Sequence, residues 1–201
     1  MAKPLRVVIV ILVLAVCALS GWLIGQPGSA ARHHPARHAS SAPASVPAGP
    51  TSHIQSLTPV RAATFDPYGS GQDSQLARLA IDASPSTAWH TDWYTTAKFG
   101  NLKPGTGLLI DMGRAVTVTS ARINLGRAAG ADFQLRVGAT RAPLASLHRV
   151  ARVTDASGKV RLRLAKPARG RYVLIWFTTL PHNASGTFEA SVYNVRLAGL
   201  R

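Results

Sequence analysis

Acidic residues, cysteine and aromatic residues are scarce in this 201-residue sequence, and these scarcities exclude several classes of protein. Only one cysteine is present, which rules out an internal disulfide framework and a cysteine-rich zinc site. The eight Asp and Glu side chains are scattered among turns and strand starts, whereas a glycosidase needs two opposed carboxylates. Nucleophile-elbow, zinc-helix and phosphate-binding motifs are also missing from the sequence. We therefore expect a protein that is not an enzyme.

One long apolar run is present, and it lies at the N-terminus. Residues 7–24 contain no charged side chain and follow a short cationic start with Lys3 and Arg6. As a helix this run is about 27 Å long, close to the hydrocarbon thickness of a bilayer, about 30 Å. We expect residues 1–25 to be a single-pass membrane anchor with a cytoplasmic N-terminus. A cleaved signal peptide and a lipoprotein signal at Cys17 are the alternatives.

Residues 26–58 are rich in Pro, Ala and Ser and show no apolar periodicity. Such a segment buries too little apolar surface to offset its loss of conformational entropy, so we expect a disordered linker that spaces a domain from the membrane. His33, His34 and His38 lie close together in this segment. They predict either a small transition-metal cluster or an ordinary solvated linker.

Residues 59–201 have the length of one domain, and their pattern is that of β-structure. The clearest alternation is at residues 159–164, where charged side chains lie on one face and Val160, Leu162 and Leu164 on the other. Only residues 74–81 have helical character. We expect strands at residues 60–65, 107–112, 116–125, 133–137, 147–153, 159–164, 172–178 and 188–197. Many short strands with almost no helix predict an all-β sandwich or barrel.

Several of these segments carry more specific motifs, in a fixed order. Residues 79–89 read LAIDASPSTAW, residues 107–113 end in Asp-Met-Gly, and residues 116–123 begin with Val-Thr-Val. Together with residues 171–177 and the closing residues 191–199, they resemble the discoidin or coagulation-factor-5/8 type C family. The similarity is to its membrane-tethered, extracytoplasmic type from high-GC Gram-positive (actinobacterial) bacteria. The resemblance implies a jelly-roll β-sandwich of the galactose-binding-like type over residues 59–201.

The turn that ends in Trp89 has two implied roles. Trp89 is large enough to plug one end of a sandwich core, and we expect it to be structural. The resemblance also implies a structural calcium site formed by Asp82, Thr87 and Asn194, although Ala83 replaces the usual Gly and Asn194 replaces the usual Glu. Calcium takes about 6–8 oxygen ligands. We expect no other cofactor.

Domains of this type bind ligands with loops at one end of the sandwich, and one loop here is rich in aromatic and polar side chains. Its aromatic rings would stack on a sugar ring, and its polar groups would bind hydroxyl or anionic groups. The alternative is that the aromatic side chains fold back onto the domain. The candidate ligand-binding residues are His90, Asp92, Trp93, Tyr94, Phe99 and Lys103.

The net charge of +15, of which +11 falls in residues 59–201, predicts attraction to polyanions. No nucleic-acid-binding motif is present, and an exported domain would meet envelope polymers instead. A solvated basic sheet face without a partner is the simpler interpretation. From the apolar N-terminal run, the family resemblance and the charge together, we expect a monomeric, membrane-anchored extracytoplasmic module that binds a cell-envelope carbohydrate or anionic polymer. The alternative is a protein–protein interaction module of a cell-envelope assembly.

Overall fold

A computed structural model describes residues 53–69 and 73–200. The predicted anchor, residues 1–25, and most of the predicted linker lie outside this part of the chain, as does the histidine cluster at residues 33–38. No helix within the described residues is long and apolar enough to cross a membrane.

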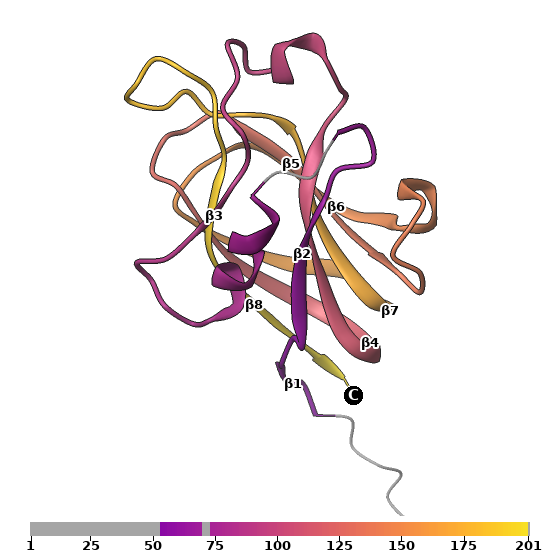
Figure 1. The fold of residues 1–201 in the computed structure, drawn as a ribbon. Helices are drawn as coiled ribbons and strands as arrows, with labels where there is room; N and C mark the ends of the chain where they lie inside the picture. The colour runs from indigo at the N-terminus through magenta and orange to yellow at the C-terminus, as the bar shows by residue number, and fades with distance from the viewer. Residues whose placement is uncertain (1–52, 70–72, 201) are drawn as a thin grey trace, which may run out of the picture. The chain divides into compact units, whose positions relative to one another are not determined.

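Antiparallel β-strands are the main regular structure of the described chain, so the prediction of an all-β domain is confirmed (Figure 1). The strands are β1 (Gln55–Leu57), β2 (Arg61–Phe65), β3 (Trp89–His90), β4 (Thr106–Leu125), β5 (Ala131–Gly138), β6 (His148–Ala156), β7 (Lys159–Thr179) and β8 (Ser191–Leu200). Three short 3₁₀-helices accompany them: η1 (Ser74–Ile81), η2 (Phe99–Asn101) and η3 (Leu144–Ser146). Strand β1 pairs with β8, although its residues fall within the range predicted as linker.

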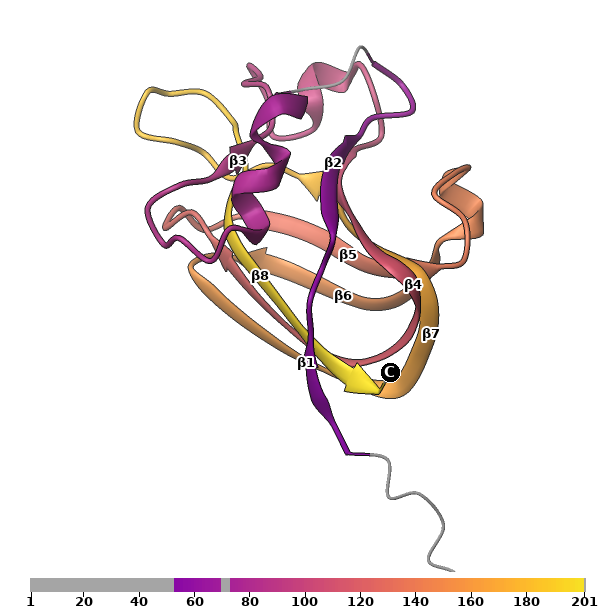
Figure 2. The same cartoon turned by 60° about the horizontal axis from the view of Figure 1, so that its bottom comes forward.

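The strands pair in the order β1-β8-β4-β7-β5-β6, with β2 beside β4 and β3 beside β8. This one sheet makes both layers of a sandwich because β4 and β7, of 20 and 21 residues, bend and continue from one layer into the other (Figure 2). The first half of β4 pairs with β2, and its second half pairs with β8. A register shift between Asp111 and Val116 marks the bend. The sequence predicted separate strands at residues 107–112 and 116–125, and the structure joins them into β4. It likewise joins the predicted strands 159–164 and 172–178 into β7.

The core lies between the two layers, where the inward-facing side chains of the strands meet. Trp89 is fully buried, stacks on Phe177 with ring centroids 6.4 Å apart, and donates from Nε1 to Thr64 Oγ1 at 2.9 Å. The structural role predicted for Trp89 is therefore confirmed. Helix η1 adds Ala77 and Ala80 to this core. A smaller apolar cluster is covered by η3, and its buried members are Phe65, Leu109, Leu147, Leu174 and Trp176.

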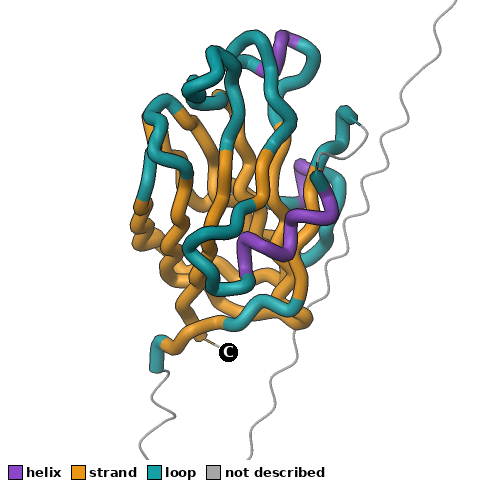
Figure 3. The backbone as a smooth tube through the Cα atoms, turned by 60° about the vertical axis from the view of Figure 1, so that its left-hand side comes forward, coloured by secondary structure: helices purple, strands orange, loops and turns teal. Residues whose placement is uncertain are grey.

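Long loops gather at the end of the sandwich away from residue 200 (Figure 3). They are the connections from β2 to η1, from β3 to β4 and from β7 to β8. We refer to this region, formed by residues 66–69, 91–105 and 180–190, as the loop end. It contains five of the six candidate ligand-binding residues, and the sixth, His90, lies at its border.

Candidate functional site

Hydrogen bonds between main chains fix the loops of the loop end to one another. Tyr94 and Phe188 exchange a pair of backbone bonds, N–H to O, at 2.9 and 2.8 Å, and Leu180 N donates to Ala97 O at 2.9 Å. One side-chain bond adds to them: Lys98 Nζ donates to Thr178 O at 3.2 Å, which ties the β3–β4 connection to the end of β7. These hydrogen bonds hold the β3–β4 and β7–β8 connections together. Side chains that point outward from the loop end therefore start from a well-fixed backbone.

A nearly buried ion pair joins two of the loops. Lys103 Nζ lies 2.7 Å from Asp66 Oδ2, and the two side chains are only 9% and 1% exposed. The Lys103 ammonium also lies 5.7 Å from the centre of the Tyr94 ring. Burial alone would lower the pKa of Lys103, but hydrogen bonds and charge interactions with Asp66 and Tyr94 outweigh it, so that the pKa is raised above its usual value. Lys103 is therefore a charged structural link and is already occupied by Asp66.

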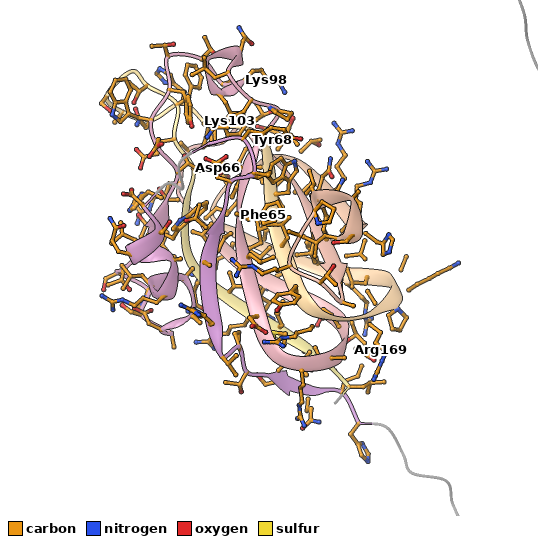
Figure 4. The ribbon with its side chains drawn as sticks, turned by 45° about the vertical axis from the view of Figure 1, so that its right-hand side comes forward. Phe65, Asp66, Tyr68, Lys98, Lys103 and Arg169 are labelled. Carbon is orange, nitrogen blue, oxygen red and sulfur yellow. The ribbon has the colours of Figure 1, made fainter. Side chains whose placement is uncertain are left out.

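The turn that follows Asp66 leaves room only for glycine at its last position. Gly69 N donates to Asp66 O at 3.4 Å, which closes the turn. A Cβ atom on Gly69 would collide with the Asp66 carboxylate and the Lys103 ammonium. The ion pair is thus covered by the turn. Tyr68, next to Gly69, is 57% exposed and lies with Lys103 and Asp66 at this end of the domain (Figure 4).

The three aromatic side chains predicted to bind a sugar divide into two groups. Tyr94 and Phe99 are buried and pack edge to face, with centroids 5.4 Å apart. Their rings anchor the loop to the core and do not present faces to solvent. Trp93 is 66% exposed and lies between residues that anchor the loop. Leu102, on the same loop, is also exposed.

The polar candidates of this loop have different surroundings. Asp92 is exposed, and its pKa is raised by desolvation and by Asp73 and Asp66, although Lys103 lowers it. His90 Nδ1 lies 3.0 Å from Glu189 Oε1 and 3.0 Å from Ser191 Oγ, at the start of β8. The loop end therefore offers carboxylates and an imidazole to hydroxyl groups.

A hollow of about 530 Å³ borders Tyr68. Asp66, Pro143 and Leu144 line it, and Arg141 contributes a cation at its edge. An exposed ring beside a hollow with a few polar groups is the usual composition of a small-ligand site. Tyr68 and Arg141 were not among the residues predicted from the sequence. The Asp66-Pro67 dipeptide is typical of a turn, but no pattern in the sequence places that turn beside residue 103 or residue 141.

Of the three residues predicted to hold calcium, Asn194 lines a different cavity. Asp82 and Thr87 lie in the turn before β3, which contributes Ala83 and Pro85 to that cavity. Asp82 accepts hydrogen bonds from Ser84 N and Thr87 Oγ1, both at 2.8 Å. Asn194 Oδ1 accepts a bond from Arg196 Nε at 3.3 Å and lies in a cavity lined by several basic residues. The structural calcium stays a prediction that rests on the family resemblance.

No protein-family model matches the chain, but solved structures of similar fold exist. The CBM32 module of AlyQ in complex with 4,5-unsaturated mannuronic acid is 21% identical, with a TM-score of 0.52, and the match covers 71% of this chain and 97% of that one. Chitosan-binding module 1 of the chitosanase/glucanase from Paenibacillus sp. IK-5 is 17% identical, with a TM-score of 0.54 and coverage of 73% and 100%. The family 32 module of C. perfringens NanJ, in complex with galactose, is 17% identical, with a TM-score of 0.50 and coverage of 73% and 99%.

The described domain has the fold of a CBM32 module. This β-sandwich is of the galactose-binding-like, discoidin-like type, as the sequence motifs implied. The neighbours are binding modules, although one of them also occurs in an AlyQ chain with an alginate lyase domain, of which this chain covers 34%. The membrane-tethered actinobacterial type stays a prediction.

Proposed function

We propose that this protein is a carbohydrate-binding protein and that the loop end holds its ligand. The single observation that carries the proposal is the pair of exposed rings, Trp93 and Tyr68, on two loops that the Asp66–Lys103 ion pair joins. Exposed rings on a firm base suit stacking against the apolar face of a sugar, and they lose little conformational entropy on binding. The carbohydrate ligands named for the neighbours of similar fold support the same class of ligand.

The loop end is better suited to hydroxyl groups than to a strongly anionic polymer. Lys103 is paired with Asp66, and Asp92 and Glu189 add negative charge to the same region. A sugar hydroxyl both donates and accepts hydrogen bonds, so it can bind to these carboxylates and to His90. We therefore expect neutral or weakly charged glycans at this site, and an affinity that changes little with salt.

We also propose that residues 1–25 anchor the protein in the cell membrane, with its N-terminus in the cytoplasm and its binding domain outside. The support comes from the apolar run 7–24 and the cationic residues before it. Envelope glycans would then be the polymers within reach. Protease added to intact cells should degrade the domain and leave an N-terminal fragment in the membrane, whereas a protected domain would refute this orientation.

A panel of cell-wall glycans and neutral oligosaccharides, applied to the full chain in nonionic detergent, tests carbohydrate binding. Trp93→Ala should weaken binding of each neutral glycan that the wild-type chain binds at least about fivefold, the equivalent of about 1 kcal/mol. Leu102→Ala, which truncates another exposed apolar side chain on the same loop, is the control and should leave affinity unchanged. Binding that survives both changes would place the site elsewhere, and a panel with no positive member would favour the alternative, a protein–protein interaction module.

A further inference from the structure

Three arginine side chains form a row across the second layer of the sandwich. Arg122 of β4 lies directly opposite Arg161 of β7 on one side and opposite Arg196 of β8 on the other. Neighbouring strands are about 4.8 Å apart, so three guanidinium groups start from adjacent backbone positions. Like charges directly opposite each other destabilise a sheet. A row of this kind has an energetic cost that a bound anion would remove.

The row lies on the outer face of the layer. The residues on either side of Arg122 in the chain, Ala121 and Ile123, are buried in the core, whereas the three arginines are exposed. Because side chains alternate along a strand, the next outward positions are two residues away. At those positions, Lys159 and Arg163 of β7 add two more cations. We call Arg122, Lys159, Arg161, Arg163 and Arg196 the basic face.

No carboxylate among the described residues forms an ion pair with the basic face, although all eight acidic side chains lie in that part of the chain. Three of them pair elsewhere: Asp66 with Lys103, Asp111 with Arg171, and Glu189 with His90. Asp82 lies in the turn before β3, and its carboxylate accepts hydrogen bonds from Ser84 N and Thr87 Oγ1. Positive charge is therefore concentrated on this face.

A cavity of about 300 Å³ opens on the basic face. Ala83 and Pro85, from the turn before β3, form one wall, and the side chains of Asn124 and Asn194 lie among the cations. Side-chain amides donate hydrogen bonds to hydroxyl groups and accept hydrogen bonds from them. A guanidinium group can donate two parallel hydrogen bonds to two oxygens of one anionic group, such as a carboxylate or a sulfate. The composition matches a ligand that carries both hydroxyl and anionic groups.

Nucleic acids and anionic lipid bilayers fit the basic face less well than acidic glycans do. The exposed large apolar side chains of the described residues are Ile54, Val60, Tyr68, Trp93 and Leu102, and none of them lines this cavity. The cavity therefore offers no ring on which a nucleobase could stack and no apolar side chain to insert into a bilayer. Basic residues also occur far from the loop end. Arg169, for example, lies at the opposite end of the domain from Lys98 and Lys103 (Figure 4).

We propose that the basic face is a second binding surface, specific for acidic glycans, and that the cavity holds one of their sugar units with its anionic group against Arg122 and Arg161. This surface is separate from the loop end and does not depend on it. A chain of acidic sugars would lie along the sheet and contact several cations at once. The protein would then bind neutral sugar with its loops and acidic polymer with its sheet.

The test measures binding of the full chain, in nonionic detergent at about 50 mM salt, to polygalacturonate, to heparin and to neutral dextran. The double variant Arg122→Gln/Arg161→Gln should weaken binding to a polyanion about tenfold or more, because it removes two charge-assisted contacts. Arg114→Gln/Arg127→Gln, two exposed arginines outside the cavity, removes the same charge and should cost less than twofold. Polygalacturonate alone would identify carboxylate as the anionic group, heparin alone sulfate, and both a general acidic-glycan surface.

Equal losses in the two double variants would show that net charge alone attracts the polymer and would overturn the proposal. Binding of neither polyanion would overturn it too, as would binding only to phosphatidylglycerol vesicles, which would indicate a lipid surface. Trp93→Ala should leave polyanion binding unchanged, so failure of the loop-end proposal and failure of this one are told apart. As a check on folding, the Arg122→Gln change should not lower the melting temperature, because it relieves repulsion within the row.

Discussion

Lys103 and Asp66 are 37 residues apart in the chain, yet their ammonium and carboxylate groups lie 2.7 Å apart and are almost completely enclosed. The pair connects the loop that carries Trp93 to the turn that carries Tyr68. Because the two charges are removed from water, each depends on the other for its compensation. The position of the exposed rings therefore depends on this enclosed ion pair.

Lys103→Met should lower the free energy of unfolding by roughly 3–5 kcal/mol, the cost of leaving a buried carboxylate without its partner. Lys166→Met, on β7, removes an exposed lysine that is not part of the loop end and should cost less than about 1 kcal/mol. Urea denaturation of both variants measures the difference. Equal effects would mean that the Asp66–Lys103 pair is solvated and does not hold the loops.

Trp89→Ala should cost roughly 3–5 kcal/mol of unfolding free energy, the range for deleting a large buried aromatic side chain. The loss follows from complete burial, the stacking on Phe177 and the hydrogen bond to Thr64. Trp89→Phe keeps part of the packing and should cost less. A melting temperature that stays at the wild-type value in Trp89→Ala would contradict the assignment of Trp89 to the core.

Stability should fall in acid through Asp111. Two hydrogen bonds from Arg171, at 2.7 and 2.8 Å, and one from Gly113 N lower the pKa of Asp111. The unfolded chain therefore takes up the proton first, so the contribution is fully present above the unfolded pKa of about 3.9 and is lost as pH falls through the lower folded value. Asp111→Asn should flatten the decline of the melting temperature between pH 5 and pH 2.5.

Asp155→Asn is the control for this pH dependence, because Asp155 forms no ion pair within the described residues. Its melting temperature should follow the wild-type profile. If Asp111→Asn and Asp155→Asn decline together with the wild type, the Asp111–Arg171 pair does not cause the acid sensitivity.

The strands of this domain could be predicted from the sequence because their alternation is local. Residues 159–164 show the pattern on one short segment, and the structure places Lys159, Arg161 and Arg163 outward as the pattern requires. The bends of β4 and β7 were not predictable, since a bulge depends on how the strand packs in two layers. The row of Arg122, Arg161 and Arg196 could not be predicted either, because it depends on the register of three strands.

The candidate site was predictable only in part, for a similar reason. An aromatic and polar loop indicated a binding region, but the exposure of Trp93 and the burial of Tyr94 and Phe99 depend on which ring meets the core. Lys103 was expected to bind ligand, whereas the structure pairs it with Asp66 on a loop distant in sequence. Pairings between loops arise from the converging ends of strands, and no local pattern encodes them.

The most direct test of carbohydrate binding at the loop end is a ¹⁹F NMR titration of the full chain labelled with 5-fluorotryptophan. The chain has four tryptophans, and of the three in the described residues, Trp89 and Trp176 are buried while Trp93 is exposed. Trp93→Phe assigns the resonance of Trp93 by its disappearance. We predict that a bound glycan shifts the Trp93 resonance and leaves those of Trp89 and Trp176 in place; a glycan that binds without moving the Trp93 resonance would contradict the account.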